Sequence, residues 1–207
     1  MSTLAAVQPY NQVFDGQKHY RTLLQCTARP GTIGQLDDAL LDVPSQLNRA
    51  TALLAMALFS GDISFCLSEE VASAKSFIER ETNAKPAPAE QADFLILSDA
   101  SAFEGLRKAK QGSLSFPDLG ATVVRQVEAI SPAPLPGSLR LTLTGPGIET
   151  ETVVFVRGAS EEFFEILRER NAEFPLGVDA FLTCDSLSAG PCVLGLPRTT
   201  RVRCERV

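Results

Sequence analysis

The sequence has little with which to build a metal or redox site. It contains a single histidine, His19, and none of its five cysteines forms a Cys-x-x-Cys pair. Zinc sites normally use such spacings, so the sequence predicts none. The odd number of unpaired cysteines is instead typical of reduced, mostly buried thiols in a cytosolic protein. These cysteines are Cys26, Cys66, Cys184, Cys192 and Cys204.

Long apolar runs and an excess of positive charge are also missing. No 18 consecutive residues are apolar, and no basic segment followed by an apolar core opens the chain. We therefore expect neither a membrane span nor a signal peptide. The net charge of −6 argues against a nucleic-acid partner, which would need a basic face. A local group of arginines could still bind a small anion.

The usual catalytic motifs are not present. The chain has no G-x-x-x-x-G-K-[ST] loop and no G-x-S-x-G elbow. Gly145-Pro146-Gly147 resembles the start of a dinucleotide fingerprint, but the third glycine is missing, so a structural turn is favoured over phosphate binding. His19 has no nucleophile partner in the sequence, and a position on a helix surface or interface is favoured. Glu161 and Glu162 are best explained as acids in the first turn of a helix.

The pattern of apolar residues predicts one α/β domain over residues 1–207, with residues 1–12 as a flexible arm. Asp15 is a candidate cap for the first helix, whose stripe would contain Tyr20, Leu23, Leu24 and Thr27. The alternation of helices and strands indicates a layered mixed sheet with flanking helices. We expect helices over about 16–27, 45–61, 70–81, 101–110 and from 160, and strands over 63–67, 94–97, 121–127, 139–144 and 153–156.

The most informative stretch is the C-terminal block, residues 173–201, which reads as a turn, a strand, a loop, a second strand and a polar tail. Alternation from residue 178 places Val178, Ala180, Leu182 and Cys184 on one face, and Asp179, Phe181 and Thr183 on the other. A carboxylate at the start of an apolar strand needs a partner, because burying it alone is costly. Arg198, just after the second strand, can grip a carboxylate or a phosphate with two parallel hydrogen bonds. An edge strand is expected after it, around Val202 and Cys204.

Several arginines lie beside turns: Arg21, Arg29, Arg198 and Arg201. The favoured interpretation is surface solubility and ion pairing. The alternative is an anion or interface site, since the guanidinium is planar and always charged. The candidate residues for that site are Arg21, Arg29, Asp179, Arg198, Thr199 and Thr200.

Several segments together resemble one protein family, the H subunit of carbon–phosphorus lyase. The resemblance covers nearly the whole chain and is most specific in the C-terminal block, although the family's common Ala-Met-Ser run is replaced by Gln25–Ala28. The matching segments are His19–Leu24 with Arg29–Gly31, Pro117 with Gly120–Thr122, Leu143–Ile148, Phe174–Asp179 and Leu196–Thr200.

The resemblance implies a part in bacterial phosphonate breakdown. Subunits of the family work with partner subunits G, I and J and with ATP-binding partners. Together they form ribose 1-phosphonate 5-triphosphate from ATP and a phosphonate, and J then cuts the carbon–phosphorus bond in a radical step. The present chain lacks a cysteine run for an iron–sulfur cluster, so that radical step is expected elsewhere.

The resemblance also implies a fold similar to pyridoxal-phosphate-dependent transferases, without the cofactor. That cofactor needs a Schiff-base lysine, and all five lysines precede residue 111, on expected helices or loops. We therefore expect no cofactor. The leading hypothesis is a scaffold subunit, cytoplasmic and homodimeric when alone. The alternative is a stand-alone enzyme or binding protein that takes a phosphorylated ligand near Arg198.

Overall fold

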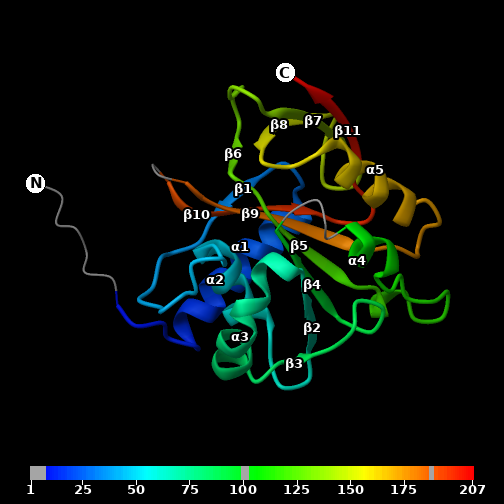
Figure 1. Cartoon of the computed structure of the whole chain (residues 1–207). Coiled ribbons are helices and arrows are strands. Elements are labelled where there is room, and N and C mark those ends of the chain that lie inside the picture. The colour runs from blue at the N-terminus through cyan, green and yellow to red at the C-terminus, as the bar shows by residue number, and fades with distance from the viewer. Residues whose placement is uncertain (1–7, 99–102, 187–188) are drawn as a thin grey trace, which may run out of the picture.

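The computed structural model describes residues 8–98, 103–186 and 189–207. A seven-stranded mixed sheet runs through its centre, with helices on both faces and a second sheet of four strands on one side (Figure 1). The α/β class with a mixed sheet and flanking helices is thus confirmed. The helices are α1 (Phe14–Ala28), α2 (Arg49–Leu58), α3 (Lys75–Thr82), α4 (Phe103–Lys108) and α5 (Glu161–Arg170), with 3₁₀ turns at Glu69–Ala74 and Pro117–Leu119.

The seven-stranded sheet has the order β1-β10-β9-β5-β4-β2-β3. The five strands from β9 to β3 run parallel to their neighbours, whereas β10 and β1 are antiparallel additions at one edge. Parallel neighbours need crossover connections, which α3, α4 and α5 supply. The strands are β1 (Ile33–Gln35), β2 (Ser64–Leu67), β3 (Lys85–Pro86), β4 (Phe94–Leu97), β5 (Thr122–Gln126), β9 (Asp179–Ser186) and β10 (Gly190–Leu196).

The four-stranded sheet is antiparallel, with the order β11-β7-β8-β6, and most of it is inserted between β5 and α5. The alternation had predicted β7 (Leu139–Thr144), β8 (Thr152–Arg157) and the edge strand β11 (Arg201–Arg206). That they form a separate sheet was not predicted, because alternation does not show which strands pair. The strand β6 (Ala129–Ser131) was missed because three residues are too few for a periodic pattern.

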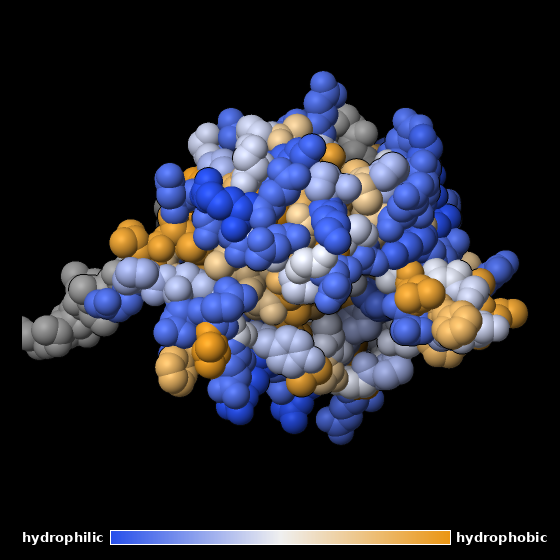
Figure 2. All heavy atoms as spheres, turned by 90° about the horizontal axis from the view of Figure 1, so that it is seen from below, coloured by the Kyte–Doolittle hydropathy of each residue, from blue (hydrophilic) through white to orange (hydrophobic). Residues whose placement is uncertain are grey.

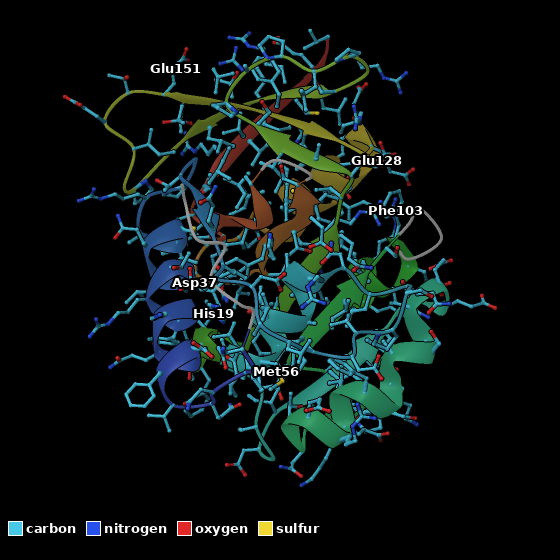
Figure 3. The ribbon with its side chains drawn as sticks, turned by 90° about the vertical axis from the view of Figure 1, so that its left-hand side faces the viewer. His19, Asp37, Met56, Phe103, Glu128 and Glu151 are labelled. Atoms are coloured by element: carbon cyan, nitrogen blue, oxygen red, sulfur yellow. The ribbon has the colours of Figure 1, made fainter. Side chains whose placement is uncertain are left out.

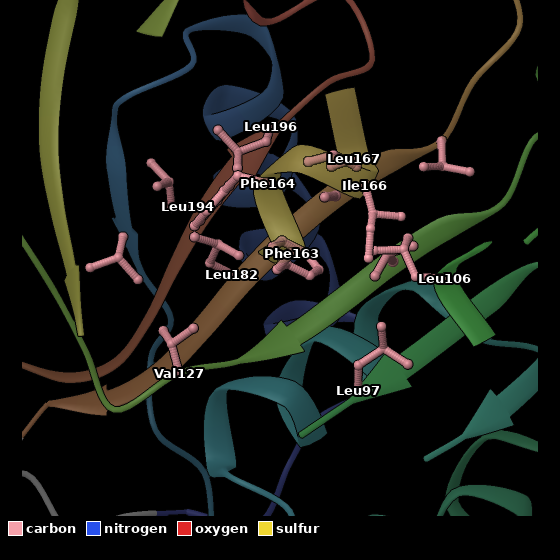
Figure 4. Close-up of a cluster of buried hydrophobic side chains, with 14 of the residues drawn as sticks. Leu97, Leu106, Val127, Phe163, Phe164, Ile166, Leu167, Leu182, Leu194 and Leu196 are labelled. Atoms are coloured by element: carbon pink, nitrogen blue, oxygen red, sulfur yellow. The ribbon is translucent and has the colours of Figure 1, made fainter. Parts of the chain in front are cut away.

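The two faces of β9 enter two separate hydrophobic clusters, as its alternation predicted. Ala180, Leu182 and Cys184 pack toward α4, α5 and the four-stranded sheet, and Phe181 packs toward α1, α2 and α3. Leu182 is fully buried, so truncating it to alanine should cost about 2–5 kcal/mol. Figure 4 shows the first cluster, in which α5 covers β9 and β10 with Phe163, Phe164, Ile166 and Leu167.

The start of α1 differs from the prediction. The helix begins at Phe14, and the side chain of Asn11, not Asp15, accepts hydrogen bonds from the amides of Val13 and Phe14, at 3.1 and 3.0 Å. Asp15 accepts from the amide of Asn11 at 2.7 Å instead. An acceptor that precedes the first turn can reach free amides, whereas Asp15 already lies inside that turn.

The buried face of α1 is also rotated from the expected stripe. Leu23 is buried as predicted, but Tyr20 and Leu24 are 52% and 55% exposed, and the inward face is completed by Gly16, His19 and Cys26. His19 is only 1% exposed, so its placement on a surface was wrong. Its Nε2 donates to the backbone oxygen of Asp37 at 3.0 Å (Figure 3), whereas its Nδ1 is buried without a hydrogen-bond partner among the described residues.

Residues 8–12, the described part of the expected flexible arm, make defined contacts. Pro9 forms a bridge with Leu40, and the Gln12 amide donates to the backbone oxygen of Met56 at 3.0 Å. The ring of Tyr10 lies 5.6 Å from that of His19. The rest of the expected arm, residues 1–7, lies outside the described residues.

Two further helix starts test the sequence predictions. Ser160 caps α5 as expected, accepting from the amide of Phe163 at 3.4 Å. The helix expected from Ser45 begins at Arg49, because Asn48 caps it by accepting from the amide of Thr51 at 2.7 Å. Asp99 and Ser101, the two candidate caps for the helix expected to run to about residue 110, lie outside the described residues. Within the described ranges, no helix is both long and apolar enough to cross a membrane.

Candidate functional site

Arg198 and Asp179 form an ion pair between the start of β9 and the segment that follows β10. Arg198 Nη2 donates to Asp179 Oδ2 at 2.7 Å, and Nε lies 3.3 and 3.2 Å from Oδ1 and Oδ2. The backbone amide of Arg198 also donates to Oδ1 at 2.8 Å. Two-pronged geometry of this kind makes strong, directional bonds, and the predicted pairing of these two residues is present.

The remaining nitrogen of Arg198 binds two loops. Nη1 donates to the backbone oxygens of Pro117 and Pro175, at 2.7 and 3.3 Å. Gly120 provides the space for this arrangement, because a Cβ there would lie 2.9 Å from both terminal nitrogens of Arg198 and closer still to the Gly177 oxygen. Every guanidinium nitrogen of Arg198 therefore donates to a protein acceptor.

Asn171, just after α5, fixes the same region from the other side. Its side chain accepts from the Val178 amide at 2.7 Å and donates to the Val178 oxygen at 3.0 Å, like an extra strand residue. Gly177 has φ +149° and touches the Asn171 side chain, so a larger residue there would collide with it. Asn171 was not predicted from the sequence, because no motif marks a hydrogen bond between a side chain and a backbone group of another segment.

A cleft of about 730 Å³ lies beside this ion pair. Its walls come from α5, the turn between β7 and β8, and the segment from Arg198 to the start of β11. The volume falls in the range of small-molecule sites. It is lined by Gly145, Pro146, Phe164, Leu167, Arg168, Asn171, Ala172, Phe174, Arg198, Thr199, Thr200, Arg201 and Val202.

The structure brings together some of the predicted site residues. Arg198, Thr199 and Thr200 line the cleft, and Asp179 is bound to Arg198. Arg21, on α1, and Arg29, just after it, are exposed and do not line the cleft. The predicted cluster of six residues is thus divided between two places.

Two features of the cleft modify the interpretation of the sequence. Arg168, which is not among the candidate site residues predicted from the sequence, lines the cleft from the last turn of α5. Gly145-Pro146-Gly147 forms the turn between β7 and β8, with φ of +133° and +84° at its glycines. A signal for Arg168 existed, since Phe164 and Arg168 are four residues apart on one helix face.

The thiols are poorly suited to nucleophilic chemistry. Burial raises the pKa of Cys184 to about 12 and those of Cys26 and Cys204 to about 11. A thiol reacts as its thiolate, so these side chains are inert at neutral pH. Burial also lowers the pKa of His19, which keeps the ring neutral. Among the described residues, no group of three or more His, Cys, Asp or Glu is arranged to hold a metal ion.

The fold and the fully bonded Arg198 define an α/β protein whose C-terminal block is held by one arginine–aspartate pair. Comparison with known sequences then gives the family. The profile described as "Bacterial phosphonate metabolism protein (PhnH)" matches residues 9–203, and the chain belongs to this family.

Two relatives match over most of their length. The chain is 33% identical over 196 residues to a protein of Rhizobium meliloti (strain 1021) named alpha-D-ribose 1-methylphosphonate 5-triphosphate synthase subunit PhnH, covering 93% of this chain and 92% of the relative. It is 31% identical over 186 residues to a protein of Stutzerimonas stutzeri named putative C-P lyase subunit protein HtxG, covering 90% and 85%.

Proposed function

We propose that this chain is a subunit of a bacterial carbon–phosphorus lyase complex and is needed for growth on phosphonates. The observation that carries the proposal is the family match over residues 9–203, together with relatives that are named as subunits of such complexes. Each match covers more than four-fifths of this chain and of the relative. Residues 1–207 are therefore proposed to act as one domain with the role of the relatives.

Within that complex, the proposed role is accessory and not catalytic. The chain would help form ribose 1-phosphonate 5-triphosphate from ATP and a phosphonate, with subunits G, I and J as partners in the cytoplasm. The raised pKa values of its buried thiols and the use of Arg198 in internal hydrogen bonds support a structural role. Alone, the chain is proposed to form a homodimer.

The proposed fold relationship is to pyridoxal-phosphate-dependent transferases that have lost the cofactor. The mixed seven-stranded sheet with helices on both faces is compatible with it. Lys85, one of the five lysines expected on helices or loops, lies instead on strand β3. A cofactor absorbance band from the purified protein would contradict this part of the proposal.

Exposed apolar side chains support a partner surface near the C-terminal block. Leu114, Phe116 and Leu119 are 77%, 59% and 56% exposed on the loop before β5. Figure 2 shows apolar side chains on the projection at the right, where Figure 1 places this loop. Arg198 joins this loop to that of Phe174, which is 69% exposed. Such patches on a soluble protein are typical of interaction sites.

Deletion of the gene in its own host tests the proposal. Growth with methylphosphonate as the sole phosphorus source should be lost, growth on phosphate should be normal, and a plasmid copy should restore growth. The purified chain should show a mass near twice 22.2 kDa and no turnover of ATP with methylphosphonate. Normal growth of the deletion strain on methylphosphonate would contradict the proposed role.

A further inference from the structure

The cleft beside Arg198 has an unusual charge for this protein. Three arginines line it, and none of its lining residues is acidic. The chain as a whole carries 25 acidic and 19 basic residues, so its average surface is negative. A concave surface of one sign concentrates field lines and attracts ions of the opposite sign. The cleft is therefore a local positive region on a protein whose net charge is negative.

Two of the three arginines keep their hydrogen-bond donors for a ligand. Arg198 is neutralised by Asp179. Arg168 and Arg201 are exposed, and neither has a side-chain hydrogen bond or ion pair with the residues that the structure describes. They come from different elements, the last turn of α5 and the first residue of β11. Because both residues lie in regular secondary structure, the backbone positions of the two side chains are fixed.

The rest of the cleft is apolar. Phe164 and Leu167 line it with side chains that are each 3% exposed, whereas Phe174 is 69% exposed. Thr200 also lines the cleft, and its hydroxyl oxygen is buried without a hydrogen-bond partner among the described residues. An apolar wall with a few polar groups is the usual composition of a small-molecule site.

We propose that this cleft binds a small organic anion with a phosphoryl or phosphonyl group and an apolar portion. The anionic group would lie between Arg168 and Arg201, and the apolar portion would lie against Phe164, Leu167 and Phe174. A carboxylate can satisfy one guanidinium fork, whereas the three oxygens of a phosphonate can accept from two. Preference for a phosphonate rests on the proposed function, but anion binding in the cleft does not.

Calorimetric titration of the full chain with phenylphosphonate tests the proposal. Saturable binding is expected, at least about ten-fold tighter than binding of methylphosphonate, which lacks the apolar ring, and of benzoate, which lacks the third oxygen. Benzyl alcohol, which has no charge, should bind still more weakly. Absence of saturable phenylphosphonate binding, or equal binding of phenylphosphonate and benzyl alcohol, would overturn the proposal.

Single variants localise the binding. Arg168→Gln and Arg201→Gln should each weaken phenylphosphonate binding about ten-fold, which corresponds to about 1.4 kcal/mol. Arg203→Gln is the matched control, because Arg203 is exposed on the same strand as Arg201 but does not line the cleft. It should change the Kd by less than about two-fold. Equal effects of all three variants would mean nonspecific attraction and would contradict the site.

A second readout separates this inference from the proposed assembly. Both cleft variants should still co-purify with the partner subunits, since Arg168 and Arg201 do not belong to the exposed apolar loop on which the proposed partner surface is centred. If the variants lose the partners while the wild-type chain binds no phenylphosphonate, the cleft is a protein interface and the proposal fails. If phenylphosphonate binds as expected but no partner is captured, only the proposed assembly fails.

Discussion

Arg198 Nη2 lies 2.7 Å from Asp179 Oδ2, and the Arg198 side chain is only 12% exposed in this pair. The two residues are 19 positions apart, on either side of the β9–β10 hairpin. Through Nη1 the same arginine binds the loops that contain Pro117 and Pro175. One side chain thus fixes three segments that meet at the edge of the cleft.

Replacing Arg198 should destabilise the protein. Arg198→Ala leaves the partly buried Asp179 carboxylate without its cation and frees two backbone oxygens, so the free energy of unfolding should fall by about 3 kcal/mol. Arg198→Lys should recover little, because a single ammonium cannot form the fork and reach both loops. Urea denaturation followed by circular dichroism measures both changes. A loss below about 0.5 kcal/mol in Arg198→Ala would contradict the structural role of the pair.

Gly120 gives a second test of the same packing. A methyl group there would collide with the Gly177 oxygen and the Arg198 guanidinium, so Gly120→Ala should cost more than about 2 kcal/mol. Gly105→Ala is the matched control, because its new methyl would meet Leu95 at an ordinary 3.8 Å inside α4. The control should gain about 0.5–1 kcal/mol from helix propensity. Equal effects of the two substitutions in thermal unfolding would argue against the close approach at Gly120.

His19 predicts how stability changes with pH. Burial lowers its pKa in the folded state below the unfolded value of 6.5, so the folded protein binds fewer protons than the unfolded chain. Its contribution is complete above about pH 6.5 and is lost as pH falls toward the folded pKa, by up to about 1.4 kcal/mol per pH unit.

Unfolding free energies measured from pH 7.5 to 5 should therefore decline in the wild type. The His19→Asn variant should be less stable at pH 7.5 and should have a flatter profile, because the chain has no other histidine. Parallel pH profiles of the two proteins would show that His19 does not titrate as expected.

The exposed loop before β5 predicts an effect on assembly alone. Phe116→Ser removes an exposed ring, so the unfolding temperature of the isolated chain should stay within about 2 °C, while affinity for the partner subunits should fall at least about ten-fold. Leu40→Ser is the control, since Leu40 is 64% exposed on a different loop. Surface plasmon resonance against the reconstituted partners measures the affinity of both variants. Equal losses in the two variants would contradict a surface centred on the loop.

Alternating patterns predicted the strands well because each face of β9 has its own core. The division of Ala180 and Leu182 from Phe181 follows from alternation alone. The pairing of Asp179 with Arg198 was also predictable, since a carboxylate at the start of a buried strand requires a cation. The residue types were therefore enough to predict which face of a strand is buried and which charged residues need a partner.

The predictions that were wrong or missing concern burial and contacts that depend on the tertiary structure. The apolar stripe of α1 was placed on Tyr20 and Leu24, whereas a backbone oxygen of a distant loop allowed His19 to take the buried position. The cleft could not be predicted, because Arg168 and Arg201 line one cleft only as a result of the packing of α5 on β11. Contacts of this kind depend on the arrangement of elements and not on local sequence.

Co-purification with identified partners tests the central claim most directly. A tagged copy of this chain, expressed with the G, I and J subunits of its own host, should elute with all three, and native mass spectrometry should give a single assembly with defined stoichiometry. Omission of one partner at a time would identify the subunit that this chain contacts. Recovery of the tagged chain alone, while G, I and J assemble without it, would contradict its role as a subunit.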